Sequence, residues 1–320
     1  MLAAAKRQLS RTEVSVLVIT LLVLVLFHLL SSQFLTVGNM KVVLGIAPEV
    51  GIVAVGVAVL MIAGEFDLSV GATFALAPML VVVLAPLGVD PVVAIVIGLA
   101  ACMFVGFVNA VFTLAFDLPS FIITLGTMFV VRSVVVLLAG GLPPPLPEGI
   151  PEAVFVGWVG PFRASILWYA GIVIAASYLL GRTNLGNWIY ATGGDYQAAK
   201  DLGINVNAVK TFCFVLCALL AGFAGFIQSL RVHAALTSLG TGIELEAIAA
   251  AVIGGVALRG GIGTPIGAAL GALLIRLIDN GLVMARIDAN WFRLAVGVLT
   301  IGAVVFNEIL RRQARRMRVG

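Results

Sequence analysis

Long apolar runs separated by short polar or glycine- and proline-containing turns are the main pattern of this chain. Val14–Leu30 and Val92–Ala101 are two such runs. They lack the alternation of apolar and polar residues that a transmembrane β-strand shows. In hydrocarbon their backbone must be hydrogen-bonded within the segment, which predicts helices. The expected spans are 14–33, 42–63, 70–87, 91–115, 120–140, 165–181, 211–230, 243–258, 262–284 and 290–309.

The pattern therefore predicts an all-α, polytopic membrane protein with about ten transmembrane helices. Composition agrees with it, because 62% of the residues are hydrophobic and only 11% are charged, with a mean hydropathy of +1.18. Soluble domains carry about 25% charged residues. So few charges cannot solvate the surface of a globule, and a soluble enzyme is excluded. We expect residues 1–320 to form a single transmembrane domain.

Basic residues predict the orientation. Lys6, Arg7 and Arg11 precede the first apolar run, which is longer than a signal-peptide core and lacks a small-residue cleavage site. We therefore expect a retained first span with a cytoplasmic N-terminus. Ten spans then place 182–210 and the basic tail 310–320 in the cytoplasm, with twelve Lys and Arg residues inside and five outside. The tail thus indicates orientation, not nucleic-acid binding.

The eighth segment is too short for a full span. Its apolar stretch Ala247–Leu258 has 12 residues and is flanked by Glu244 and Glu246 before it and by glycines after it. A hydrocarbon core about 30 Å thick needs about 20 residues. A broken or half-length segment near 243–265 is one interpretation, and it is typical of transport pathways. A full helix whose first turns face protein is the other.

The chain lacks the common signatures of covalent catalysis. None of its lysines follows a glycine as in a phosphate-binding loop, and His28 and His233 show no zinc-binding spacing. Cys213 and Cys217 are interpreted as packing residues. We expect no catalytic residue, no metal and no cofactor in this chain.

Polar residues inside apolar segments are the main candidates for function, because they are costly in lipid. They either join helices by hydrogen bonds or line a path for a polar solute. The candidate path residues are Asp67, Ser69, Asn109, Thr124, Thr127 and Gln228. Arg132 and Arg276 are isolated charges expected to find a carboxylate partner or an interface.

Two further patterns concern packing and energy coupling. Gly263, Gly267 and Gly271 recur every four residues, a stripe that allows close helix packing. No chain of intramembrane carboxylates suited to proton or sodium coupling is present. The sequence therefore favours an uncharged solute moved with energy supplied by another protein.

The polar segment 182–210 is expected to be structured. Asp195 can cap a short helix over Tyr196–Leu202, and Gly203 can end it. A short amphipathic helix between two spans suggests a docking element for a cytoplasmic partner. An ordered loop without a partner is the alternative.

Four motifs carry a resemblance to bacterial ATP-binding-cassette (ABC) importer permeases of the ribose, xylose and arabinose type. The segment 190–195, followed by Ala198-Ala199 and Gly203-Ile204, resembles their coupling-helix signature. The other three similar stretches are 64–71, 118–127 and 244–255 with Gly260-Gly261. The resemblance covers about residues 40–310. Arg259 and the proline-rich loop at 141–163 depart from the family pattern.

The resemblance implies a multi-chain importer in the bacterial inner membrane. A second permease subunit, identical or paralogous, would complete the pathway. A cytoplasmic ATPase would bind ATP and Mg, and a periplasmic sugar-binding protein would deliver a neutral monosaccharide. The ATPase-coupling residues it implies are Gly193, Gly194, Asp195, Ala198, Ala199, Gly203 and Ile204.

Other functions stay open at this stage. They are an ion-coupled secondary transporter of a polar solute, an intramembrane enzyme, and an ABC permease for a polyol or a furanosyl signalling molecule.

Overall fold

The computed structural model describes residues 2–140, 144–288 and 290–319, and nearly all its regular structure is helical. The long helices are α1 (Leu2–Leu30), α2 (Val37–Ile62), α3 (Val70–Leu84), α4 (Pro91–Ala115), α5 (Ser120–Ala139), α7 (Ala164–Arg182), α10 (Val206–Val232), α12 (Pro265–Met284) and α13 (Asn290–Val319). The shorter elements are η1 (Ala85–Leu87), α6 (Glu152–Val156), α8 (Asn184–Gly194), α9 (Tyr196–Asp201), α11 (Ile243–Ile253) and the antiparallel pair β1 (Trp158–Val159) and β2 (Phe162–Arg163).

Seven helices of the described chain are long and apolar enough to cross a membrane. They are α2, α3 with η1, α4, α5, α7, α10 and α12. This confirms an all-α polytopic membrane protein. The remaining three predicted spans fall on α1, α11 and α13, so the number ten stays a prediction. Residues 141–143, at the start of the proline-rich loop, and residue 320 of the basic tail lie outside the described residues.

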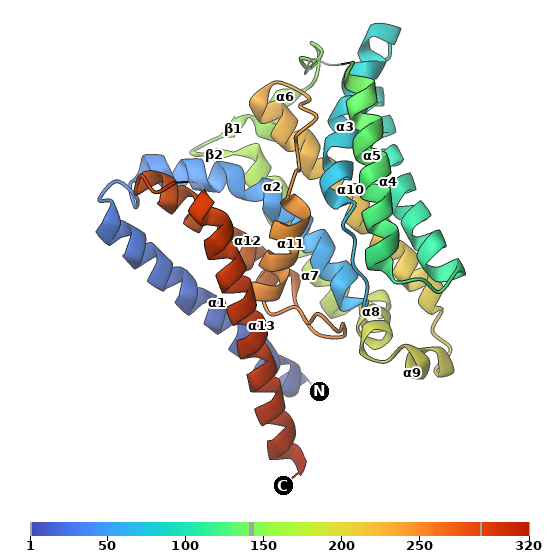
Figure 1. Cartoon of the computed structure of the whole chain (residues 1–320), viewed down its shortest axis with the longest axis vertical. Helices are drawn as coiled ribbons and strands as arrows, with labels where there is room; N and C mark the ends of the chain where they lie inside the picture. The colour runs from blue at the N-terminus through green and yellow to red at the C-terminus, as the bar shows by residue number, and fades with distance from the viewer. Residues whose placement is uncertain (1, 141–143, 289, 320) are drawn as a thin grey trace.

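Helix α2 forms the centre of the molecule. Every residue from Ala47 to Ile62 is buried, and α2 packs against α7, α10, α11 and α12. Helices α4 and α5 lie at one edge and α1 and α13 at the opposite edge (Figure 1). The outer helices expose large apolar side chains such as Phe104, Phe129 and Leu137, as lipid contact requires. Helix α1 begins and α13 ends on the side of the molecule that carries α8 and α9 (Figure 1).

The segment expected to be half-length is a short helix followed by irregular backbone. Helix α11 has 11 residues, which at 1.5 Å per residue is about half of a 30 Å hydrocarbon core. The chain then leaves helical geometry through Gly255, Gly260 and Gly261, whose φ angles are +91°, +81° and +71°. Glycine adopts these angles without the strain that a side chain would add.

The expected ninth span needs a correction at its start. The helix begins at Pro265, with Thr264 as its N-cap, so Gly263 lies before it at a φ of +151° and does not share a helical stripe. Proline favours the first helical position because its missing N–H needs no partner there. Gly267 and Gly271 do lie on α12. A Cβ on either one would sit 2.1 Å from a carbonyl oxygen, that of Gly254 or Ala250, so α12 touches the backbone of α11.

Candidate functional site

The polar segment between α7 and α10 folds into two consecutive helices, α8 and α9. Asp195 caps α9, because its Oδ1 accepts a hydrogen bond of 3.0 Å from the N–H of Ala198. Gly203 follows the helix with a φ of +82°. The predicted short helix is thus confirmed and ends at Asp201. Helix α8 was not predicted. Thr183 caps it by accepting a hydrogen bond of 3.1 Å from the N–H of Gly186.

The two faces of α9 differ. Ala199 is only 2% exposed and packs inward, whereas Leu202, just after the helix, is 80% exposed. Lys210 lies under the helix, with its Nζ 5.1 Å from the centre of the Tyr196 ring, and it forms an ion pair with Glu65. Helix α9 is therefore anchored on one side and presents an exposed apolar residue on the other.

The residues predicted to couple to an ATPase divide between these faces. Those exposed to solvent are Gly194, Asp195, Ala198 and Gly203; Gly193, Ala199 and Ile204 are partly or fully covered by this chain. Their contact with an ATPase stays a prediction, and the exposed set is the part that a partner can reach without rearrangement.

Three glycine-containing segments meet at the end of α8. We call them the glycine junction: 62–64, 193–194 and 260–261. The N–H of Gly261 donates a 2.8 Å hydrogen bond to the carbonyl of Ile62. A Cβ on Gly193 would lie 1.8 Å from the same oxygen, and one on Gly260 would lie 2.6 Å from the carbonyl of Gly193. Only glycine lets three backbones come this close. The junction joins α8 to the end of α2 and to the irregular segment after α11.

Four of the predicted path residues form one buried polar network. Ser69 donates a 2.6 Å hydrogen bond to Asp67, and Asn109 of α4 donates a 2.9 Å bond to Ser69. Thr124 of α5 accepts a 3.0 Å bond from the N–H of Leu68. Burial raises the pKa of the Asp67 carboxyl to about 6. In this conformation the network fixes the linker between α2 and α3 against α4 and α5.

The hydroxyl of Thr124 stabilises the fold by accepting the hydrogen bond of the Leu68 N–H, and this contribution can be measured. Thr124→Val is expected to destabilise the protein by about 1–3 kcal/mol, because the buried N–H of Leu68 loses its acceptor. Thermal unfolding of the purified permease measures this loss. Thr127→Val, on the same helix at a partly exposed position, is the control and should change stability by less than about 0.5 kcal/mol. Equal effects of the two substitutions would contradict this role for Thr124.

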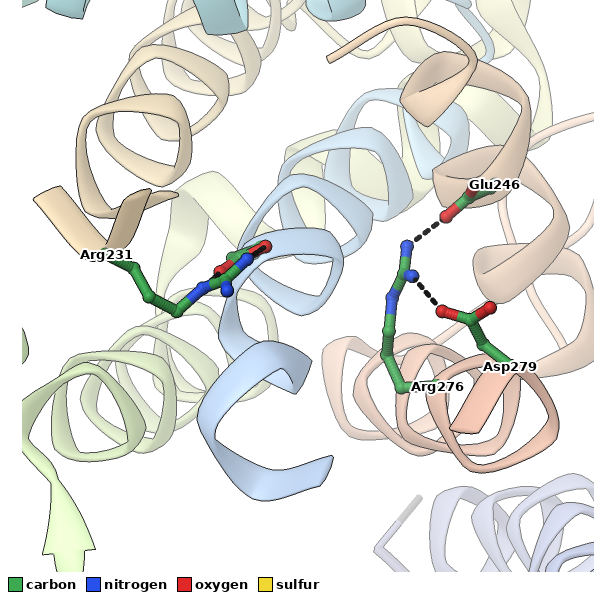
Figure 2. A network of polar contacts seen from close by, with 5 residues as sticks. Arg231, Glu246, Arg276 and Asp279 are labelled. Atoms are coloured by element: carbon green, nitrogen blue, oxygen red, sulfur yellow. Dashed lines mark hydrogen bonds and ion pairs between the residues drawn. The ribbon is translucent and has the colours of Figure 1, made fainter. Parts of the chain in front are cut away.

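Ion pairs join the segments around α11. Arg276 of α12 pairs with Glu246 of α11 and, at 2.9 Å, with Asp279 (Figure 2). Arg231 of α10 pairs with the buried Glu49 of α2, its Nη2 lying 3.2 Å from Oε2. The expected carboxylate partner of Arg276 is thus confirmed.

Arg132 has a different type of partner. It donates hydrogen bonds of 2.7–2.8 Å to the carbonyl oxygens of Thr237, Leu239 and Gly71. A carboxylate partner or an interface was expected for Arg132, and it instead binds main-chain oxygens, because the loop after α10 turns back over α5. Arg132 thereby fixes the loop 233–242, which leads into α11.

A cavity of about 220 Å³ opens between α10, this loop, α11 and α12. We call it the α11 pocket. It is lined by Gln228, Ser238, Leu239, Gly240, Thr241, Ile243, Glu246 and Arg276. Gln228 was predicted from the sequence, but Ser238, Thr241 and Glu246 were not. The available signal was the polar stretch directly before the short segment with its two glutamates.

The six predicted path residues therefore do not share one place. Gln228 lines the α11 pocket, and Asp67, Ser69, Asn109 and Thr124 belong to the buried network. Thr127 lies partly exposed on α5. Whether they line a path stays a prediction.

Comparisons with known proteins agree with the transport motifs. Residues 39–304 match the family described as "Branched-chain amino acid transport system / permease component". The chain is 36% identical to the ribose import permease protein RbsC of Escherichia coli K12, over 90% of this chain and 91% of that protein.

It is also 32% identical to the autoinducer 2 import system permease protein LsrC of Salmonella typhi, over 95% of this chain and 88% of that one. No solved structure matches the chain significantly.

Proposed function

Because the chain belongs to the family of permease components of the branched-chain amino acid transport type, we propose that it imports a neutral monosaccharide as the membrane subunit of an ABC transporter. One observation carries the choice of solute: 36% identity with a ribose import permease over 90% of the chain. A pocket with amide and hydroxyl side chains in its wall supports it. The hydroxyls of a neutral sugar can form hydrogen bonds with such side chains, and the pocket needs no excess of charged side chains to bind them.

The proposed assembly contains more chains than this one. A second permease, identical or paralogous, completes the path, and a periplasmic binding protein delivers the sugar. A cytoplasmic ATPase binds ATP and Mg and docks on α8–α9. The isolated apolar surface of Leu202 and the exposed cap Asp195 support this docking site. This chain itself performs no chemical step.

The proposed topology places α8 and α9 on the cytoplasmic side of the inner membrane. It has ten membrane segments, with α11 as a half-length one and with both termini in the cytoplasm. Two observations support this topology. Basic residues are in excess on that side, and the start of α1, the end of α13 and helices α8 and α9 all lie on the same side of the molecule (Figure 1). The apolar surface of the outer helices contacts lipid.

A second candidate solute is a furanosyl signalling molecule. The identity of 32% with an autoinducer 2 permease favours it over a polyol. Both solutes are neutral and hydroxyl-rich, so the same pocket chemistry serves either one.

Transport in proteoliposomes tests the proposal. The permease is reconstituted with its ATPase and binding protein. Uptake of radiolabelled D-ribose is expected only when ATP is present on the side of the membrane that carries the ATPase and the binding protein is present on the opposite side. Omitting either partner should reduce uptake to the rate of empty vesicles. Uptake that persists without them under a proton or sodium gradient would instead establish an ion-coupled secondary transporter.

A further inference from the structure

The α11 pocket has the properties of a binding site for a small polar molecule. Its volume of about 220 Å³ is below the range of about 300–1,000 Å³ that is typical of sites for drug-sized ligands. Its wall comes from four separate segments: α10, the loop 233–242, α11 and α12. Ser238 and Thr241 are exposed, so water and solutes reach them from outside the chain.

Hydrogen-bonding groups of three kinds converge in this wall. Gln228 carries donors and an acceptor, and its side chain also hydrogen-bonds Glu49. The Ser238 hydroxyl can donate or accept, whereas the Thr241 hydroxyl already donates to the Ser238 carbonyl and remains able to accept. The Nε of Arg276 is buried and has no hydrogen-bond partner among the described residues. A sugar hydroxyl, which both donates and accepts, matches such a set.

The charges of the wall also limit the class of solute. Arg276 is the basic residue of the pocket, and both its Nη atoms pair with carboxylates, those of Glu246 and Asp279 (Figure 2). A phosphate group would need basic side chains free to bind it. The pocket therefore suits a neutral solute better than a sugar phosphate.

We propose that the α11 pocket is a solute-binding subsite of this permease. Gln228, Ser238 and Thr241 hydrogen-bond the hydroxyls of a neutral sugar there, and the Arg276–Glu246 pair forms a charge-balanced wall beside it. This assignment rests on the proposed function, since it locates where the imported solute contacts the chain.

Protection of engineered cysteines tests the site directly. Ser238→Cys and Thr241→Cys are each introduced into the full importer complex and reacted with a membrane-impermeant thiol reagent. The native Cys102, Cys213 and Cys217 are buried, which keeps their reaction slow. D-ribose is expected to slow labelling at both positions several-fold. Leu87→Cys, 74% exposed in η1, is the control and should react at the same rate with and without sugar.

A second variant tests Gln228, whose side chain also hydrogen-bonds the buried Glu49, so thermal stability is measured beside uptake. Gln228→Ala is expected to lower ribose uptake per ATP hydrolysed by about tenfold, the loss of one hydrogen bond to the solute. Gln33→Ala makes the same chemical change at an exposed position before α2, and it should leave this ratio unchanged. Equal ratios for both variants and wild type would overturn the role of Gln228.

The outcomes distinguish this inference from the proposed function. ATP-driven ribose uptake by the wild-type complex, with no protection of the pocket cysteines by ribose, would overturn the subsite and leave the function standing. Protection by L-leucine and not by D-ribose would overturn the neutral-sugar assignment. Labelling does not require uptake, so protection by ribose in a complex that fails to import it would support the subsite and reject the transport proposal for ribose.

Discussion

Gly193→Val is expected to abolish ATP-driven uptake. At this position even a single Cβ would lie 1.8 Å from the carbonyl oxygen of Ile62 and 2.8 Å from the nitrogen of Gly261. Both neighbours are main-chain atoms, so no rotamer change can make room. The backbones of the glycine junction must move apart, and the hydrogen bond from Gly261 to Ile62 breaks with them.

Two measurements separate the loss of coupling from the loss of folding. Overpacking costs about 1–3 kcal/mol, so the variant should unfold several degrees below the wild type and still be recovered from the membrane. Uptake in proteoliposomes is then measured with the recovered protein. Gly171→Val, in α7 with no neighbouring atom within 4 Å of the added Cβ, is the matched control and should keep both stability and uptake. If Gly193→Val takes up the sugar at the wild-type rate, uptake does not depend on the close contact of the three backbones in the glycine junction.

Leu202→Asp is expected to weaken binding of the ATPase to the permease by more than about tenfold. Leu202, directly after α9, is 80% exposed, more than any other large apolar side chain of the segment 184–204. A carboxylate there must lose its hydration when the surfaces meet, and the apolar contact is lost as well. Losing a buried Leu side chain and desolvating an unpaired carboxylate together cost about 2 kcal/mol or more, which is more than tenfold in affinity.

The measurement is the affinity of the purified ATPase for permease in nanodiscs, together with ATP hydrolysis stimulated by the loaded binding protein. Thermal stability of the permease should change by less than about 0.5 kcal/mol, because an exposed residue makes few contacts. Leu87→Asp carries the same change on η1, distant from α9 along the molecule (Figure 1), and should bind the ATPase normally. Unchanged affinity for Leu202→Asp would remove this residue from the docking surface.

The sequence predicted the ends of a helix well where a capping residue or a proline marks them. The span 91–115 coincides with α4, because Asp90 caps the helix by accepting a 2.9 Å bond from Val92 and Pro91 starts it. Hydropathy was a poor guide to the ends of α1 and α13. They extend to Leu2 and Val319, beyond the expected 14 and 309, because a helix continues after it leaves the lipid. Helix α8 was missed because it is too short for a membrane span and three of its 11 residues are glycine.

The candidate sites were less predictable because they depend on contacts between distant segments. The motif glycines were recognised, but nothing in the sequence indicates that Gly193 and Gly260 touch, 67 positions apart. Likewise, two of the three main-chain oxygens that accept hydrogen bonds from Arg132 belong to a loop more than 100 residues away. Main-chain acceptors carry no residue-specific pattern, so no inspection of side-chain types could identify them.

Because the glycine junction consists of main-chain contacts, it responds to a movement of α8 differently from a contact between side chains. Side chains absorb small displacements by changing rotamer, whereas contacts between main-chain atoms have no such compliance. A displacement of α8 is therefore passed directly to residues 260–261, which irregular backbone separates from the end of α11 at Ile253. In the proposed importer, a movement of α8 therefore acts first on the backbone that leads into α12 at Pro265.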